Sequence, residues 1–189
     1  MIRSETKTAV AARTDARRTA TTALLAALLA GSTLLSIPLQ PVPITMQVFI
    51  VVMIALLVEP AWAALAVGAY LLIGAAGLPV FAGFHGGVSN LVDPTGGFLY
   101  GFLIGAVAGA WARTALERRG AARMAADIVA AVVVIAIVYL LGWAQLAVVA
   151  HLTPLQALAG GVAPFVVIDV LKAAGAVAVA DGVRKAARI

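Results

Sequence analysis

Six runs of mostly apolar residues follow one another along the chain, at about residues 20–37, 44–58, 60–76, 95–111, 127–149 and 158–180. A helix needs about 20 mostly apolar residues to cross a hydrocarbon core about 30 Å thick. The whole chain is 63% hydrophobic and 11% charged, whereas soluble domains have roughly 45–50% apolar and 25% charged residues. The sequence therefore predicts an all-α integral membrane protein with six transmembrane helices.

These runs leave no room for a separate soluble domain in 189 residues. We expect a basic N-terminal arm at residues 1–18, one six-helix transmembrane domain at 19–183 and a basic tail at 184–189. The first run follows basic residues, as the apolar region of a signal peptide would. The proline-rich segment after it is a poor cleavage site, so we expect this run to be kept as a span.

The basic residues predict the orientation of the spans. Of the 13 Lys and Arg residues, all but Lys172 lie in residues 1–18, 113–123 and 184–188. Short cytoplasmic loops accumulate Lys and Arg, and six spans place these three segments on one side. We therefore expect a multi-pass protein of the cytoplasmic (inner) membrane with both termini in the cytoplasm.

The remaining basic residue, Lys172, lies inside the last apolar run, three residues after Asp169. Residues i and i+3 share one face of a helix. An ionisable residue in a span costs about 2.5–3.5 kcal/mol on insertion scales and usually faces the protein interior or a watery cavity. We expect this pair to contact a ligand or an ion, and the alternative is an ion pair that only neutralises itself.

A long glycine-rich loop, residues 77–94, separates the third run from the fourth. Glycines allow the backbone to approach a ligand closely, and they provide hinges. We expect this loop to act as a lid, with Phe81 and Phe98 as walls of an apolar cavity and Asn90 as a polar contact. The lid candidates in and beside the loop are Gly83, Gly86, Gly87, Asp93, Thr95 and Gly96. The alternative is an irregular surface loop that shields helix ends.

Two further segments hold candidate contacts. The first outer loop contains Thr45 and Gln47, and also Gln40, neutral groups that can hydrogen-bond a ligand; equally, they can belong to a rigid turn facing water. The first run has small residues at helical spacing, which permit close helix approach. Ala23, Ala27 and Ala30 are the candidates for partner docking, with internal packing as the alternative.

Enzymatic chemistry is not expected. The chain has no Cys and 2 His, both in predicted loops, and it shows no metalloprotease, nucleophile-elbow or P-loop motif. We therefore expect no catalytic residue, metal or cofactor, and ATP-driven transport would need a partner. The net charge of +5 is explained by basic residues in the predicted cytoplasmic segments, so nucleic acid is not an expected partner.

Four motifs occur in order through most of the chain: Pro43-Ile44-Thr45-Met46-Gln47, Gly77-Leu78-Pro79-Val80-Phe81, Asp93-Pro94-Thr95-Gly96-Gly97-Phe98-Leu99, and Pro164-Phe165 followed by Asp169 and Lys172. In this combination the sequence resembles the BioY family, the biotin-specific substrate-binding S components of energy-coupling-factor (ECF) vitamin transporters. The family commonly has glycine where this chain has Asp93, and often tyrosine where it has Phe98.

The resemblance implies a six-helix S-component fold that binds biotin with high affinity from the outer side, beneath the loops after spans one and three. It also implies partners in biotin uptake, namely a transmembrane coupling protein and two ATPases, with the coupling protein docked on span one. Some members of the family occur without a dedicated module of this kind. A homo-oligomer is compatible with the sequence.

Biotin has an acidic tail and a ureido ring. Lys172 suits the carboxylate, Asp169 can accept a ureido N–H bond or hold Lys172, and Asn90 suits the ureido group. The reverse orientation, with the ureido ring beside Lys172, stays open. The alternative functions are an S component for another small anionic vitamin and a small ion-coupled transporter or channel in which the charged pair is a gate.

Overall fold

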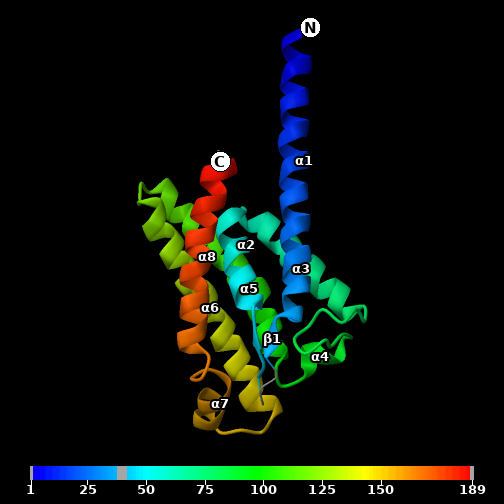
Figure 1. Ribbon diagram of the computed structural model, residues 1–189, viewed down its shortest axis with the longest axis vertical. Helices are drawn as coiled ribbons and strands as arrows, with labels where there is room; N and C mark the ends of the chain where they lie inside the picture. The colour runs from blue at the N-terminus through cyan, green and yellow to red at the C-terminus, as the bar shows by residue number, and fades with distance from the viewer. Residues whose placement is uncertain (1, 38–41, 188–189) are drawn as a thin grey trace.

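The computed structural model describes residues 2–37 and 42–187, and the side chains within 15–37 and 42–186. Six long helices make the bundle: α1 (Ile2–Gly31), α2 (Gln47–Leu57), α3 (Pro60–Ala75), α5 (Gly96–Arg118), α6 (Arg123–Val149) and α8 (Val166–Ala187) (Figure 1). The shorter elements are the 3-10 helix η1 (Ser32–Leu34), the strands β1 (Ser36–Ile37) and β2 (Ile44–Thr45), and the helices α4 (Ser89–Val92) and α7 (Pro154–Gly161). The predicted all-α membrane fold is confirmed.

Five of the six predicted spans each correspond to one helix, and the sixth is divided between α7 and α8. The helices differ in length. α5 and α6 are each long and apolar enough to cross a membrane. α7 and α8 reach that length and hydropathy only as a pair, which is bent by 51° and has the form of either a broken span or a re-entrant loop. α2 and α3 are shorter apolar helices of 11 and 16 residues. A span count of six therefore stays a prediction.

Two helix boundaries differ from the simplest expectation. The described part of the predicted arm belongs to α1, which continues without a break into the first apolar run. The last run is broken: Thr153 and Gln156 form a capping box at the start of α7, and α8 begins after Pro164. The break places Asp169 in the first turn of α8, nearer the helix start than an unbroken span would.

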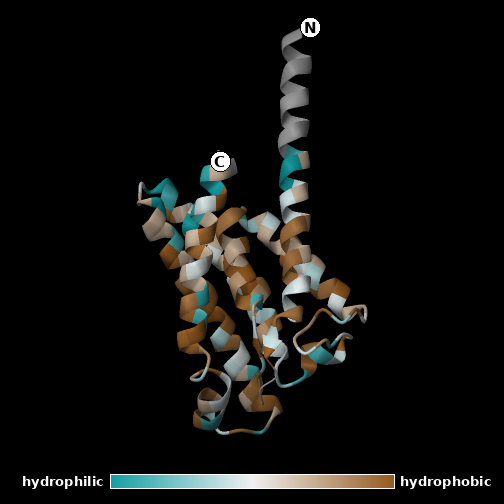
Figure 2. Ribbon diagram, viewed as in Figure 1, coloured by the Kyte–Doolittle hydropathy of each residue, from teal (hydrophilic) through white to brown (hydrophobic). Residues whose placement is uncertain are grey.

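Both ends of the described chain lie at one end of the bundle, and the β1–β2 hairpin, α4 and α7 lie at the other (Figure 1). Hydrophilic residues gather at the end near the termini, and the middle of the bundle is mostly hydrophobic (Figure 2). Large apolar side chains such as Leu72 and Val148 are exposed on the helix surfaces. This pattern is typical of a multi-pass membrane protein, whose outer surface contacts lipid.

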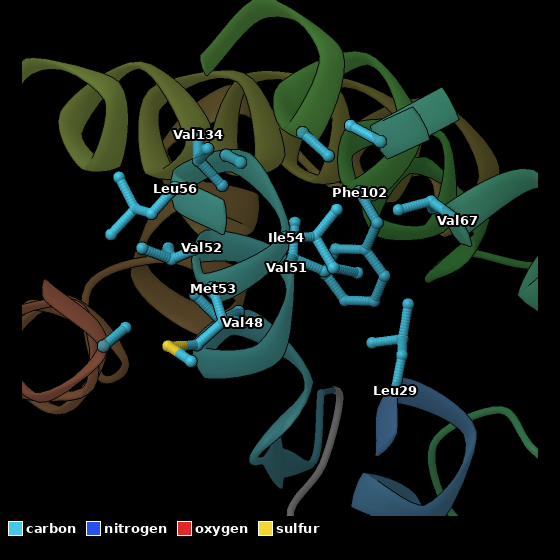
Figure 3. Close-up of a cluster of buried hydrophobic side chains, with 14 of the residues drawn as sticks. Leu29, Val48, Val51, Val52, Met53, Ile54, Leu56, Val67, Phe102 and Val134 are labelled. Atoms are coloured by element: carbon cyan, nitrogen blue, oxygen red, sulfur yellow. The ribbon is translucent and has the colours of Figure 1, made fainter. Parts of the chain in front are cut away.

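Helix α2 lies at the centre of the core. Eight of its 11 residues are buried, and they pack against α1, α3, α5, α6 and α8. Figure 3 shows Val51, Val52 and Ile54 of α2 among Leu29, Phe102 and other buried side chains of the surrounding helices. α2 is therefore fixed on all sides, and its first residue, Gln47, has a defined position.

Helices α5 and α6 approach closely along a row of glycines in α5. Gly97, Gly101, Gly105 and Gly109 recur every fourth residue and are buried. A Cβ on Gly101 would lie 2.7 Å from the Cα of Val138 in α6. Small residues at this spacing let two membrane helices pack backbone to backbone.

Two arginines hold the other end of α2. Arg113 of α5 donates to the carbonyl oxygens of Ala55 and Val58, both at 3.3 Å. Arg184 of α8 donates to the carbonyl oxygen of Leu56 at 3.1 Å and forms a buried ion pair with Asp127 of α6. The last carbonyls of a helix lack partners within it, so these arginines satisfy them. Arg184, expected in a solvated tail, is instead a buried part of α8, only 6% exposed.

Candidate functional site

A cavity lies where the β1–β2 hairpin and the start of α2 meet α5, α6, α7 and the first turns of α8. The space between its lining residues is about 550 Å³, which includes a part open to solvent. Its polar lining consists of Thr45, Gln47, Tyr139, Asp169 and Lys172. Its apolar walls include Val48, Phe98, Leu99, Phe102, Val138 and Phe165.

The charged pair forms one edge of the cavity. Lys172 Nζ donates to Asp169 Oδ1 at 2.7 Å and to the carbonyl oxygen of Thr45 at 2.8 Å. The Tyr139 hydroxyl donates to Asp169 Oδ2 at 2.8 Å. The side chains of Lys172 and Asp169 are only 11% and 6% exposed. Both charges are thus desolvated and satisfied, and the N-terminal position of Asp169 in α8 favours its negative charge.

A chain of neutral hydrogen bonds positions the next polar group. The Thr45 hydroxyl donates to Gln47 Oε1 at 3.1 Å, and Gln47 Nε2 donates to the Tyr70 hydroxyl at 2.7 Å. Gln47 and Tyr70 are 2% and 0% exposed. Because an amide nitrogen carries two hydrogens, Gln47 retains a donor beside the cavity.

Five of the predicted contacts line this one cavity: Thr45, Gln47, Phe98, Asp169 and Lys172. They come from three motifs that are far apart in the sequence. The Phe98 ring packs against Gly142 of α6, where a Cβ would overlap it, and lies 4.0 Å from the Cβ position of Gly161 in α7. Phe98 is therefore an apolar wall, as expected.

The structure places Phe81 and Asn90 elsewhere. Phe81 is 2% exposed and packs edge-on against Tyr70, with ring centroids 5.5 Å apart. Asn90 Nδ2 donates to the carbonyl oxygens of Gly86 and Gly87 at 2.9 and 3.2 Å. Neither residue lines the cavity, because one completes the core and the other satisfies carbonyls of its own loop. Gln40 lies outside the described residues.

The loop at residues 77–94 is anchored to the bundle by hydrogen bonds. Its chain bridges Phe81 to His85, and the Thr33 hydroxyl donates to the Phe81 carbonyl at 2.7 Å. Gln145 Nε2 of α6 donates to the carbonyl oxygens of Leu91 and Asp93 at 2.9 and 2.7 Å. Of the loop, Ala82 reaches the cavity lining.

The lid candidates have different structural roles. Gly83 and Gly87 have φ angles of 74° and 102°, which favour glycine. A Cβ on Gly86 would collide with backbone of Gly77 and Leu78, and one on Gly96 with the Leu91 carbonyl. The side chain of Asp93 is exposed and Thr95 is half-buried before α5. These residues shape the loop, and none of them lines the cavity.

The three small residues of α1 share one helical face but differ in exposure. Ala23 and Ala27 are exposed, next to Leu24 and Leu28, which are 59% and 47% exposed. Ala30 is half-buried and packs against the core. The open face of α1 therefore includes two of the three alanines, and partner docking there stays a prediction.

Sequence reasoning missed Tyr139 and Tyr70. Each is a polar aromatic residue inside an apolar run, Tyr139 between Val138 and Leu140 and Tyr70 between Ala69 and Leu71. The reasoning that found Asp169 and Lys172, that polar groups inside spans face protein or a cavity, applies equally to a phenol that needs a hydrogen-bond partner.

The chemical groups of the site are those of a binding cavity. Within the described residues, no group of three or more His, Cys, Asp or Glu side chains could hold a metal ion. The cavity combines apolar walls with one charged pair and three neutral polar side chains, an arrangement suited to a small amphipathic ligand. Fold and site together define a multi-pass helical membrane protein with a partly polar cavity suited to a small molecule.

Comparisons with known proteins agree with this class. The sequence pattern of the BioY family matches residues 5–189. The chain is 36% identical over 167 residues to the "Probable biotin transporter BioY" of Pyrococcus horikoshii, covering 88% of this chain and 95% of the relative. It is 35% identical over 159 residues to the biotin transporter BioY of Rhizobium etli, covering 80% and 84%.

A solved structure has the same fold. The crystal structure of the S-component for biotin from an ECF-type ABC transporter matches with a TM-score of 0.85, at 23% identity, over 92% of this chain and 93% of that one. The chain belongs to the BioY family.

Proposed function

We propose that this chain binds biotin in the cavity beside Lys172 and Asp169 and acts in biotin uptake as the S component of an ECF-type transporter. The membership of the BioY family and the relatives named biotin transporters support this function. The observation that carries the proposal is a buried ammonium group in a cavity with otherwise largely apolar walls.

The cavity offers complementary groups for both ends of biotin. An ammonium group has three donors, and two of those on Lys172 have acceptors among the described residues. The third can bind the biotin carboxylate or, in the reverse orientation, the ureido oxygen. Gln47 supplies a neutral donor, and Phe98 and Phe165 cover the apolar parts.

The arrangement in the membrane follows from the charges. We place both termini in the cytoplasm, with six spans in the cytoplasmic membrane, because the basic segments gather at the end of the bundle that holds both termini. The cavity lies toward the opposite end, near the β1–β2 hairpin and α7. Biotin therefore enters from outside.

Uptake against a gradient needs an energy source. The sequence has no P-loop, so we assign ATP hydrolysis to two ATPase subunits and their contact to a transmembrane coupling protein. The open face of α1 with Ala23 and Ala27 is the proposed docking surface, since small residues permit close helix approach.

Equilibrium binding to the detergent-purified protein tests the ligand. We expect biotin to bind selectively over thiamine and riboflavin, and uptake into proteoliposomes that contain the coupling module to depend on ATP. Binding of another vitamin in place of biotin would reassign the substrate, and biotin-independent ion flux would replace the proposal with an ion-coupled carrier.

A further inference from the structure

A second cavity lies at the end of the bundle near both termini, and it shares no lining residue with the cavity beside Lys172 and Asp169. It is formed by α1, the turn between α2 and α3, and the second half of α5, and it holds about 880 Å³ of space, part of it open to solvent. We call it the arginine pocket, defined by Arg17, Arg18, Thr21, Glu59, Trp62 and Arg113.

The charge of the pocket is predominantly positive. Three guanidinium groups and one carboxylate line it. Arg18 NH2 lies 3.0 Å from Glu59 Oε1, with side chains 46% and 56% exposed, so Glu59 holds Arg18 at the rim without burying it. Each guanidinium has five donors in a planar fork, which leaves Arg18 with donors for a further anion.

Arg113 gives the pocket a fixed charge at its base. Its side chain is 12% exposed and is held by the carbonyls of Ala55 and Val58. Glu117 lies 3.4 Å from Arg113 and also 3.8 Å from Arg123, so its single charge is shared between two arginines. Glu59 and Glu117 are thus shared among three described arginines, Arg18, Arg113 and Arg123.

The residues of the pocket are typical of the depth at which membrane helices meet lipid head groups. Arg17 and Arg18 come directly before the first apolar run, and Trp62 is in the first turn of α3, just after the Glu59-Pro60 turn. Tryptophan is enriched where membrane helices meet lipid head groups. Basic pockets between helices at this depth bind the head groups of anionic lipids.

We propose that the arginine pocket binds the phosphate group of an anionic phospholipid. Arg17 and Arg18 donate hydrogen bonds to the phosphate oxygens, and Arg113 stabilises the charge from below. Trp62 covers the glycerol region, while the acyl chains lie along exposed apolar side chains of α3 such as Leu65, one turn after Trp62. Guanidinium groups suit this role because their fork matches the geometry of phosphate.

Lipid competition tests the site. The full-length protein is reconstituted in an equimolar mixture of phosphatidylglycerol and phosphatidylcholine, gently extracted, and the retained lipids are counted by native mass spectrometry. The test variant is Arg17→Gln with Arg18→Gln. The matched control is Arg118→Gln with Arg119→Gln, a second adjacent pair of exposed arginines at the same end of the bundle that loses the same charge.

We expect the wild type and the control to retain phosphatidylglycerol preferentially. The test variant should lose that preference by about tenfold, since each basic residue near an anionic surface adds to the attraction. Loss of the Arg18–Glu59 surface pair should not unfold the protein. Thermal unfolding without added lipid checks that the test variant is folded. With phosphatidylglycerol added, the midpoint should rise for the wild type and the control but not for the test variant.

Three outcomes would overturn the proposal. They are an equal loss of phosphatidylglycerol in test and control variants, no preference in the wild type, and displacement of the lipid by inorganic phosphate at constant ionic strength. Biotin binding is measured on the same samples and should change by no more than about twofold, because distant sites act additively. Failure of the lipid site is thus distinguishable from failure of biotin binding.

Discussion

Tyr139 controls how the carboxylate of Asp169 faces the cavity. Lys172 binds one oxygen of this carboxylate and the Tyr139 hydroxyl binds the other. The two hydrogen bonds come from different helices, α8 and α6, so together they fix the orientation of the carboxylate. An ionised acceptor makes such bonds stronger than neutral ones.

We predict that Tyr139→Phe weakens biotin binding by about three- to tenfold, since it removes one hydrogen bond to a charged group while leaving the ion pair in place. Isothermal titration of the purified protein measures the change. Tyr100→Phe is the matched control, because Tyr100 is 40% exposed on α5. Equal affinities of the two variants would show that Asp169 does not need the phenol.

Whether the role of a single residue could be predicted depended on whether its partners could be inferred from the local sequence. Asp169 and Lys172 are charges in an apolar run, so the cost of a charge inside a predicted span was enough to identify them as site candidates. Asn90 looked like a ligand contact because an amide suits a ureido group, but backbone carbonyls of its own loop need donors. The turns of that loop depend on contacts with other segments, which no local pattern in the sequence records.

At the scale of elements, α2 connects the cavity to the opposite end of the bundle. Its first residue, Gln47, lines the cavity, and its last carbonyls accept hydrogen bonds from Arg113 and Arg184. Arg184 also pairs with the buried carboxylate of Asp127. One side chain therefore ties together α2, α6 and α8.

We predict that Arg184→Ala lowers the free energy of unfolding by about 3–5 kcal/mol, because it leaves the Asp127 charge buried without its partner. Thermal or denaturant unfolding in detergent measures the loss. Lys185→Ala is the control, since the side chain of Lys185 is 77% exposed and pairs only with Asp181 in the described part of the chain. Similar stabilities of the two variants would contradict the role of Arg184.

The packing of α5 against α6 gives a second prediction for elements. Gly101→Ala should destabilise the protein by about 1–3 kcal/mol, because the new methyl group meets the backbone of α6. Gly68→Ala is the matched control in α3, where nothing lies within 4 Å of the Cβ position; we expect it to be neutral or stabilising. Thermal unfolding of both variants in detergent measures the difference, and equal midpoints for the two would contradict the prediction.

Hydropathy predicted the helices well and their boundaries less well. α5 and α6 follow from uninterrupted apolar runs. The start of α1 at Ile2 was not expected, although residues 1–18 contain no glycine or proline to end a helix. Hydropathy alone did not predict the break between α7 and α8, because Pro154 and Pro164 both permit a helix start.

For the whole molecule, the central expectation is an even number of spans. The chain has no cysteine, so single cysteines report on sidedness without background. We predict that Asp15→Cys, Arg119→Cys and Lys185→Cys react with a membrane-impermeant maleimide from the cytoplasmic side. Val88→Cys and Leu155→Cys, 63% and 74% exposed in the wild type, should react from outside. Labelling of Asp15→Cys and Lys185→Cys from opposite sides would require an odd number of spans.

Biotin titration of Lys172→Ala tests the account most directly, with Lys185→Ala as the matched control and the wild type as reference. We predict that Lys172→Ala weakens biotin binding at least about tenfold, roughly 1.4 kcal/mol, while Lys185→Ala leaves it unchanged. Wild-type affinity in a folded Lys172→Ala variant would contradict the assignment of this cavity as the biotin site.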